Sequence, residues 1–135
     1  MKKIFTHLIF TVSLLSSLSA FSVPVLNSYP SAVATILIDF DGHYVQSSVW
    51  NGGNPIACAA SGMTEAQMTE AFYRVAEDFR PFDINITTDE AVFLAAPLNK
   101  RMRIIVTATS SWMPPGYGGV AYVGSFIWGD DTPAF

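Results

Sequence analysis

The chain has 135 residues, half of them hydrophobic, and its 11 acidic residues outnumber 7 basic ones to give a formal net charge of −4 at pH 7. An acidic chain without a cluster of Lys and Arg lacks the positive surface that holds nucleic acid, so we expect no nucleic-acid partner. A single cysteine, Cys58, rules out a disulfide within the chain. Cys58 is therefore either a small buried apolar residue or a thiol whose partner lies outside the chain.

The first twenty residues follow the order of a secretory signal peptide. A positive start at residues 1–3 precedes an apolar run over residues 4–18, and small residues close the segment. The apolar run is shorter than the ~20 residues that span a bilayer, which favours a cleaved leader over a membrane anchor. We therefore predict cleavage after Ser19, Ala20 or Ser22 and a mature protein outside the cytoplasm, extracellular or periplasmic, without membrane contact.

Three parts are expected along the chain: residues 1–20 as signal peptide, residues 21–33 as a linker or the remnant of a pro-segment, and residues 34–135 as one domain. Within the domain, short apolar runs bounded by Gly and Pro indicate strands, and a helical period indicates a helix. The expected elements are, in chain order, a strand over 35–40, a strand over 44–50 paired in a hairpin, a loop over 51–62, a helix over 64–80, a strand over 83–87, a short helix ending before Pro97, a strand over 103–107 and a strand over 120–128.

The clearest element is the helix over residues 64–80. Thr64 and Gln67 have the pattern of a capping box, in which each side chain bonds the backbone N–H of the other residue. Glu70 and Arg74 form a favourably ordered ion pair on the polar face. The apolar residues of the helix fall on one stripe: Met68, Phe72, Val75 and Phe79.

The order strand, long helix, strand, short helix, strand predicts an α/β fold with a mixed, mostly parallel twisted sheet and a right-handed first crossover. Residues 83–87 alternate polar and apolar, as a half-buried strand does, and Thr87 with Glu90 is expected to cap the short helix. A parallel sheet needs cover on both faces, and one long helix covers only one of them. We therefore expect the domain to be incomplete in this chain.

Asp39-Phe40-Asp41-Gly42 is the local motif that comes nearest to a catalytic one. It is similar to the motif of haloacid-dehalogenase-type phosphatases, in which the first aspartate attacks phosphorus and the second is general acid and base beside Mg²⁺. That family usually has Thr where this chain has His43, and its lysine and later acidic pair have no counterpart here. A calcium loop would need further oxygen ligands at its fixed spacing. We favour a structural role, in which Asp39 and Asp41 accept hydrogen bonds from turn amides.

A metal site of His and Cys ligands is limited by the number of such residues. His43 is the only histidine after the predicted leader, and Cys58 is the only cysteine of the chain. A zinc site needs three or four protein ligands, so these two residues cannot form one by themselves.

Residues 118–126, Gly-Gly-Val-Ala-Tyr-Val-Gly-Ser-Phe, resemble the edge strand that lines the cleft of adamalysin/reprolysin-type metzincin proteases. Residues 37–43, 75–82 and 83–88 are similar to the start of the catalytic domain in exported bacterial metzincin-like proteases. The resemblance covers residues 35–135 and lies in the order of the segments. It implies a zincin-like fold with the layout strand, helix, strand, strand, edge strand.

The resemblance also implies a function for the whole protein, that of a secreted zinc-dependent endopeptidase. The family's zinc motif, H-E-x-x-H-x-x-G-x-x-H on the helix after the fifth strand, is absent from the chain. We therefore assign no catalytic and no metal-binding residue here, and expect zinc to bind in the C-terminal half of the domain, which this chain lacks. The resemblance implies that a peptide or protein substrate pairs with the edge strand by β-augmentation, at Gly119, Val120, Ala121, Tyr122 and Val123.

Two other functions stay open. The chain could be a complete, non-catalytic secreted binding module, in which case the residues after the leader fold cooperatively by themselves. Asp39 and Asp41 could instead serve a Mg²⁺-dependent phosphatase, whose activity Asp39→Asn would abolish. We rank the endopeptidase fragment first, the binding module second and the phosphatase third.

Overall fold

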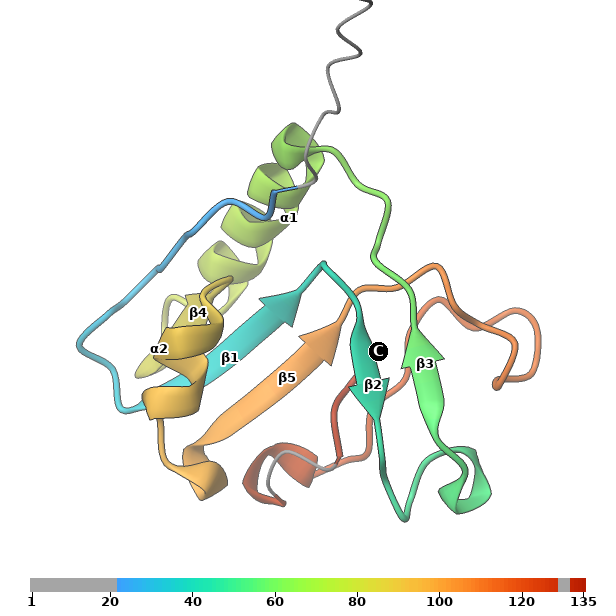
Figure 1. The fold of residues 1–135 in the computed structure, drawn as a ribbon. Coiled ribbons are helices and arrows are strands. Elements are labelled where there is room, and N and C mark those ends of the chain that lie inside the picture. Colours follow the sequence, from blue (N-terminus) through green and yellow to red (C-terminus); the bar gives the residue numbers. More distant parts are fainter. Residues whose placement is uncertain (1–21, 129–131) are drawn as a thin grey trace, which may run out of the picture.

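The computed structural model describes residues 22–128 and 132–135, so the predicted signal peptide lies outside the described residues. The chain folds around a sheet of three parallel strands in the order β4-β1-β5 (Figure 1). β1 is Ala34–Asp39, β4 is Ile84–Thr87 and β5 is Arg101–Ile105. The predicted α/β class and mostly parallel sheet are confirmed. The first crossover runs from the central strand β1 to β4 at one edge, and the second runs from β4 past β1 to β5 at the other edge.

Helix α1, Glu65–Asp78, covers one face of this sheet. Its side chains Met68 and Phe72 are buried in one apolar cluster with side chains of β1 and β4. This burial of one stripe is what the apolar spacing predicts. The predicted polar contacts are also present: the capping box of Thr64 with Gln67, and the ion pair of Glu70 with Arg74.

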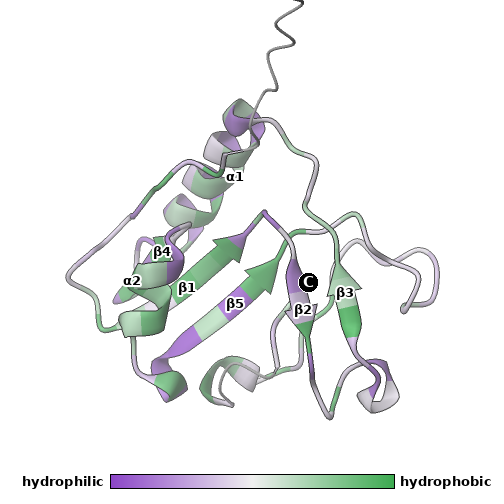
Figure 2. Ribbon diagram, in the orientation of Figure 1, coloured by the Kyte–Doolittle hydropathy of each residue, from purple (hydrophilic) through white to green (hydrophobic). Residues whose placement is uncertain are grey.

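Helix α2, Glu90–Ala95, covers the opposite face, so the expectation that only one face has a helical cover is wrong. Side chains alternate along a strand, and Arg101 and Arg103 of β5 belong to the face turned away from α1. Figure 2 shows this alternation of hydrophilic and hydrophobic residues along β5. Phe93 of α2 is fully buried, with its ring centroid 4.9 Å from each of the two guanidinium groups.

The N-terminal cap of α2 differs from the prediction. The Asp89 side chain accepts a hydrogen bond of 2.9 Å from the backbone N–H of Ala91, so Asp89 is the capping residue. Thr87 is the last residue of β4 and donates its hydroxyl to the carbonyl of Leu26, which places it outside the helix terminus. The helix does end before Pro97, as expected.

Residues 24–28 lie along the outer edge of β4. The backbone N–H of Ser28 donates to the carbonyl of Ile86 at 2.9 Å, and the N–H of Thr88 donates to the carbonyl of Leu26 at 3.1 Å. Most of β4 is buried, polar side chains included, so the prediction of a half-buried strand is wrong. The segment expected as a linker or pro-segment remnant thus supplies the neighbour of the outer edge of β4.

A small antiparallel sheet accompanies the parallel one. β2, His43–Val45, pairs with β3, Ile56–Cys58, with His43 opposite Cys58. A hairpin is present here, but not the predicted one: β2 is shorter than expected, and its partner β3 lies within the predicted loop over 51–62. The 3₁₀ turn between them, Asn51–Gly53, has positive φ at all three residues, a conformation that glycine adopts with little strain.

The last predicted strand is wrong. Residues 120–128 form no strand, and the 3₁₀ turn Ser125–Ile127 occupies their second half. Gly124 has a φ of 78°, which bends the backbone away from the strand conformation just before this turn. A further 3₁₀ turn, Leu98–Lys100, leads into β5. Among the described helices, none has the length and the apolar composition needed to cross a bilayer.

Candidate functional site

The predicted substrate-binding residues, 119–123, lie in a segment that makes one point of backbone pairing with the rest of the fold. The N–H of Val120 donates to the carbonyl of Phe135 at 2.8 Å, and the N–H of Phe135 donates to the carbonyl of Val120 at 2.9 Å. Two residues that exchange both hydrogen bonds in this way form the basic unit of an antiparallel ladder. The strand expected here is thus reduced to a single pair.

The partner of this pair is itself attached to the parallel sheet. Ala134 forms a parallel bridge with Ile104, and its carbonyl accepts from the N–H of Ile105 at 2.9 Å. The N–H of Ala134 donates to the carbonyl of Arg103 at 3.0 Å. Residues 134–135 therefore lie between β5 and Val120, and the sheet continues beyond β5 on this side.

Gly119 permits the close approach of the two chains. A Cβ atom at Gly119 would lie 2.8 Å from the carbonyl oxygen of Phe135, closer than real Cβ atoms come to such an atom. The neighbouring Gly118 has open space where its Cβ would be. The two adjacent glycines therefore differ: a side chain is accommodated at Gly118 and displaces the Phe135 backbone at Gly119.

The outer edge of this segment is available for pairing. In an antiparallel pair, the residues on either side of a hydrogen-bonded residue direct their N–H and C=O groups to the opposite edge. The backbone N–H groups of Gly119 and Ala121 donate to no residue in the described part of the chain. This edge can therefore take an extended peptide as an added strand.

Aromatic side chains hold the segment against the β2–β3 hairpin. The Tyr122 ring lies 4.5 Å from the Trp50 ring, between centroids, and the Tyr122 hydroxyl donates to the carbonyl of Val49 at 3.1 Å. The Trp50 indole N–H donates to the carbonyl of Pro133 at 2.9 Å. Val123, in contrast, is 99% exposed, so the segment ends in an apolar side chain open to solvent.

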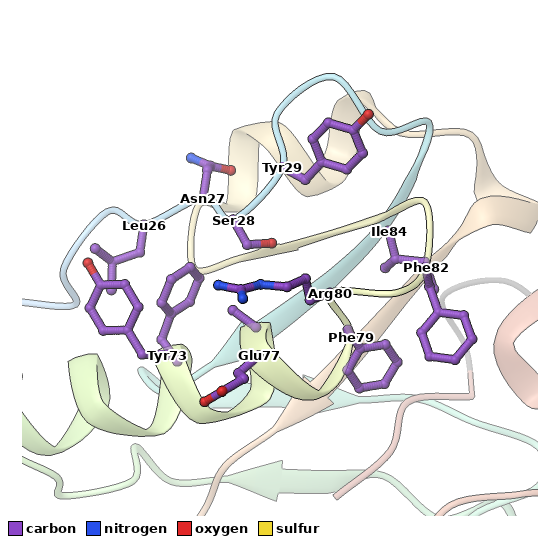
Figure 3. Close-up of a pocket in the computed structure, with 12 residues that line it drawn as sticks. Leu26, Asn27, Ser28, Tyr29, Tyr73, Glu77, Phe79, Arg80, Phe82 and Ile84 are labelled. Atoms are coloured by element: carbon purple, nitrogen blue, oxygen red, sulfur yellow. The ribbon is translucent and has the colours of Figure 1, made fainter.

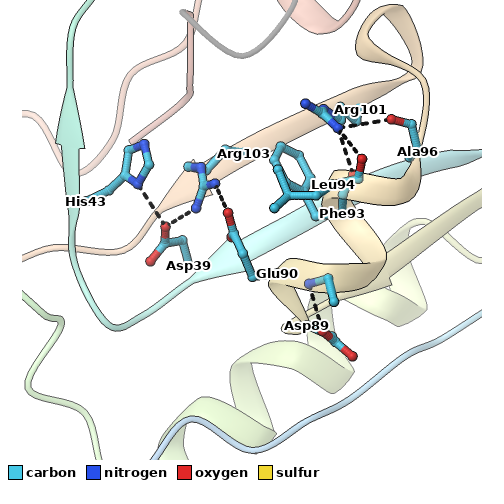
Figure 4. Close-up of polar contacts among 10 residues, drawn as sticks. Asp39, His43, Asp89, Glu90, Phe93, Leu94, Ala96, Arg101 and Arg103 are labelled. Carbon is cyan, nitrogen blue, oxygen red and sulfur yellow. Dashed lines mark hydrogen bonds and ion pairs between the residues drawn. The ribbon is translucent and has the colours of Figure 1, made fainter.

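A second site, formed by charged side chains, lies at the carboxyl ends of the parallel strands (Figure 4). Asp39, the last residue of β1, pairs with the Arg103 guanidinium through Oδ2, and both side chains are buried. The other end of the guanidinium pairs with the half-exposed Glu90 of α2 at 2.6 Å. His43 Nδ1 lies 3.7 Å from Asp39 Oδ2. Arg103 thus ties β1, β5 and α2 together beside an opening to solvent.

Arg101, two residues earlier on the same face, has a structural role. Its guanidinium donates to the carbonyls of Leu94 and Ala96 at 2.7 and 3.1 Å, at the C-terminal end of α2 (Figure 4). The last carbonyls of a helix have no intrahelical partner, and a cation there also complements the helix dipole. Arg101 therefore fixes the end of α2 that carries Phe93.

The Asp39 carboxyl is in an unfavourable position for a charge. Burial and the neighbouring Asp41 raise the pKa of Asp39 from its ordinary 3.8 to about 6, although Arg103 acts in the opposite direction. Asp39 Oδ1 has no hydrogen-bond partner in the described part of the chain. Asp39 is also one of the residues that line a cavity of about 210 Å³, together with Asp41, Gly42, Glu90 and Arg103.

The structural role predicted for the two aspartates needs correction. Among the described residues, neither Asp39 nor Asp41 accepts a hydrogen bond from a turn amide; Asp39 pairs with side chains instead. The predictions missed Arg103 and Glu90. Arg103 lies 64 residues from Asp39 and 13 residues from Glu90, the two carboxylates that it binds. The alternation of Arg with apolar residues at the start of β5 was the available signal, because an Arg on a covered strand face requires a partner.

A larger cavity, of about 540 Å³, lies between the second half of α1 and residues 26–29 (Figure 3). Aromatic rings form much of its wall, among them Tyr73 and Phe79. Arg80 extends into it from the end of α1. The carboxylate of Glu77 lines the cavity as well, so its lining holds one cation and one anion, and no predicted site residue belongs to it.

The described residues do not fit a zinc site: they contain no group of three or more His, Cys, Asp or Glu side chains placed to hold a metal ion. Cys58 is a buried free thiol whose pKa is raised by burial, which favours its predicted role as a small buried apolar residue.

Comparison of the chain with protein families, with curated proteins and with solved structures found no match.

Proposed function

We propose that this chain is the N-terminal part of the catalytic domain of an exported, metzincin-like zinc endopeptidase, and that residues 119–123 bind the peptide substrate. The observation that carries the proposal is the pairing of Val120 with Phe135 beside β5, with backbone N–H groups on the outer edge that donate to none of the residues the structure describes. An edge of this kind binds an extended peptide through its backbone and leaves side chains to determine specificity.

The arrangement of the elements supports the same proposal. The layout expected from the resemblance is strand, helix, strand, strand, edge strand, and the chain has β1, α1, β4, β5 and then the Val120 segment in that order. Residues 134–135 lie where a fifth strand would run, between β5 and the edge. The zinc ligands would follow in the C-terminal half of the domain, so we derive no catalytic step from the residues of this chain.

The binding module remains the second candidate, because an open edge binds peptides with or without a catalytic half. The phosphatase is disfavoured by the geometry of Asp39. A nucleophilic aspartate must present an accessible carboxylate oxygen to phosphorus, whereas Oδ2 of Asp39 is paired with Arg103, Oδ1 is buried, and the side chain is only 2% exposed. No comparable observation opposes either of the other two functions.

The first test is the coding sequence beyond codon 135. The proposal expects H-E-x-x-H within about fifty codons. In the full-length protein, cleavage of an extended peptide should then be abolished by a zinc chelator and restored by zinc. A stop codon directly after codon 135, together with peptide binding but no hydrolysis, would establish the binding module instead.

The second test uses the two adjacent glycines. Gly119→Ala should lower kcat/KM for an extended peptide at least about tenfold, because its Cβ displaces the Phe135 backbone and so distorts the edge. Gly118→Ala is the matched control and should change kcat/KM by less than about twofold, since its Cβ meets open space. Equal effects of the two substitutions would show that the substrate does not bind along this edge.

A further inference from the structure

The cavity at the carboxyl ends of the strands has an excess of acceptors. Three carboxylates line it, those of Asp39, Asp41 and Glu90, against the single guanidinium of Arg103. Arg103 is occupied on both sides, by Asp39 Oδ2 and by Glu90. Asp39 Oδ1 is buried without a partner in the described part of the chain. A buried carboxylate oxygen without a donor is costly, so this position calls for a donor or a positive charge.

The nearest polar neighbour, Asp41, is a second carboxylate and in that form offers no donor. Asp41 lies close enough to Asp39 to raise the pKa of the Asp39 carboxyl, and two carboxylates can approach in this way only with a proton or a cation between them. Among the described residues, no set of side chains in the cavity is suited to a metal ion. A single ammonium group, with three donors and one charge, matches two carboxylates and fits about 210 Å³.

The chain itself brings a residue near its start to this cavity. Val23 is among the residues that line it. The next residues are held in place by Thr88, at the end of β4: its hydroxyl donates to the carbonyl of Pro24 and accepts from the N–H of Leu26. Thr88 lines the same cavity. Residue 23 is thus fixed at the rim of the site by bonds to the strand next to β1.

The predicted cleavage sites include one that would make Val23 the first residue. Ala20 and Ser22 have the small-x-small spacing that signal peptidases require, so cleavage after Ser22 fits this rule, as does cleavage after Ser19, where Ser17 and Ser19 have the same spacing. Water hydrolyses the Ser22–Val23 peptide bond in this step, leaving a carboxylate on Ser22 and an amine on Val23 that takes up a proton. In the uncleaved precursor, Val23 N is an amide and carries no charge.

We propose that the α-ammonium group of Val23, produced by removal of the signal peptide, binds in this cavity between the carboxylates of Asp39 and Asp41. The ammonium supplies the missing donor to Asp39 Oδ1 and offsets one of the excess negative charges. The carboxyl end of β1 is therefore completed only in the processed protein. The inference depends on the proposed export of the chain and is independent of the peptidase activity.

The test begins with the mass of the exported full-length protein, which should show an N-terminus at Val23. Competitive acetylation of the α-amine at a series of pH values then gives its pKa. A free α-amine has a pKa of about 7.7–8.0, and the docked one should be higher by about one unit or more. The other titratable groups at the cavity are Glu90, Arg103 and His43, so His43→Gln is included to separate its titration.

Two substitutions and a control decide the assignment. Asp39→Asn and Asp41→Asn should each return the amine pKa toward the ordinary range, and Asp41 is exposed enough that its variant should fold even where Asp39→Asn does not. Asp83→Asn, at an exposed carboxylate outside the cavity, should leave the raised pKa unchanged. Insertion of Ala-Gly before Val23 should also return the pKa to the ordinary range.

The outcomes separate the inference from the proposed export. Retention of the leader in a cytoplasmic protein would overturn both export and docking. Correct processing with an ordinary amine pKa, or a raised pKa that neither aspartate affects, would overturn the docking alone. An ordinary amine pKa combined with stabilisation by added calcium ion would identify the cavity as a cation site and equally reject the ammonium.

Discussion

The contact of Phe93 with two arginines leads to a quantitative prediction. Phe93 and Phe72 are both almost fully buried, at 0% and 2% exposure, one under each face of the sheet. Phe→Leu removes similar volume at either site. At Phe93, however, the substitution also removes the ring on which the Arg101 and Arg103 guanidinium groups lie, each with its carbon 4.9 Å from the ring centroid.

The magnitude follows from the burial of the cations. A cation–π contact contributes about 0.5–1 kcal/mol when exposed and about 2 kcal/mol when desolvated, and both arginines are less than 10% exposed. Phe72 loses only its edge contact with the exposed Tyr73, which is at the lower end of about 0.5–1.5 kcal/mol. The two contacts together are worth about 4 kcal/mol, so Phe93→Leu should lower the free energy of unfolding by about 3.5 kcal/mol more than Phe72→Leu.

Urea unfolding of the two variants of the protein, followed by circular dichroism, measures this difference. Phe93→Tyr serves as a further control, because it keeps the ring face while adding a hydroxyl. Equal losses in Phe93→Leu and Phe72→Leu would refute the reasoning and would mean that the arginines are held by their hydrogen bonds alone. A difference that disappears in an Arg101→Met, Arg103→Met background would locate it in these contacts.

Two further predictions concern single residues. Asp89→Ala should lower the free energy of unfolding by about 1 kcal/mol through loss of the α2 cap, and Asp83→Ala, which caps nothing, should leave it within about 0.5 kcal/mol in the same urea titration. Cys58, the only thiol, should react with a disulfide reagent at neutral pH far more slowly in the native protein than in urea, because burial both shields it and raises its pKa; equal rates would show that Cys58 is accessible.

Elements that depend on local signals could be predicted from the sequence. Helix α1 is one: its capping box and its apolar stripe are both encoded within a few residues of each other. The short hairpin is a mixed case. The glycines after Asn51 predict a loop, and the structure has a tight turn there that joins β2 to β3.

Features that depend on distant partners could not be predicted. The polar side chains of β4 suggest a solvent-facing side, yet they are covered by α2 and by residues 24–28, about 60 residues earlier in the chain. Arg103 meets Asp39 only because the parallel register sets Leu37 beside Arg103. Residues 120–128 have the composition of a strand, but a strand needs a partner along its length, and only Val120 has one.

The two edges of the sheet explain why we propose residues 119–123, and not β4, as the place where a peptide binds. An exposed edge readily pairs with any extended chain, so a protein covers those edges that it does not use. Residues 24–28 already occupy the outer edge of β4, with backbone bonds to Ile86 and Thr88. On the other side of the sheet, residues 134–135 and Val120 extend the ladder beyond β5, and the N–H groups beside Val120 donate to no described residue. An added strand can therefore enter at the Val120 edge without displacing any described part of the chain, whereas at β4 it would first have to displace residues 24–28.

Peptide binding can be tested at both edges. A peptide that bound at the β4 edge would release residues 24–28, and their susceptibility to a protease would rise on binding. The geometry requires the opposite result: residues 119–121 become protected from amide exchange, and residues 24–28 stay resistant to the protease.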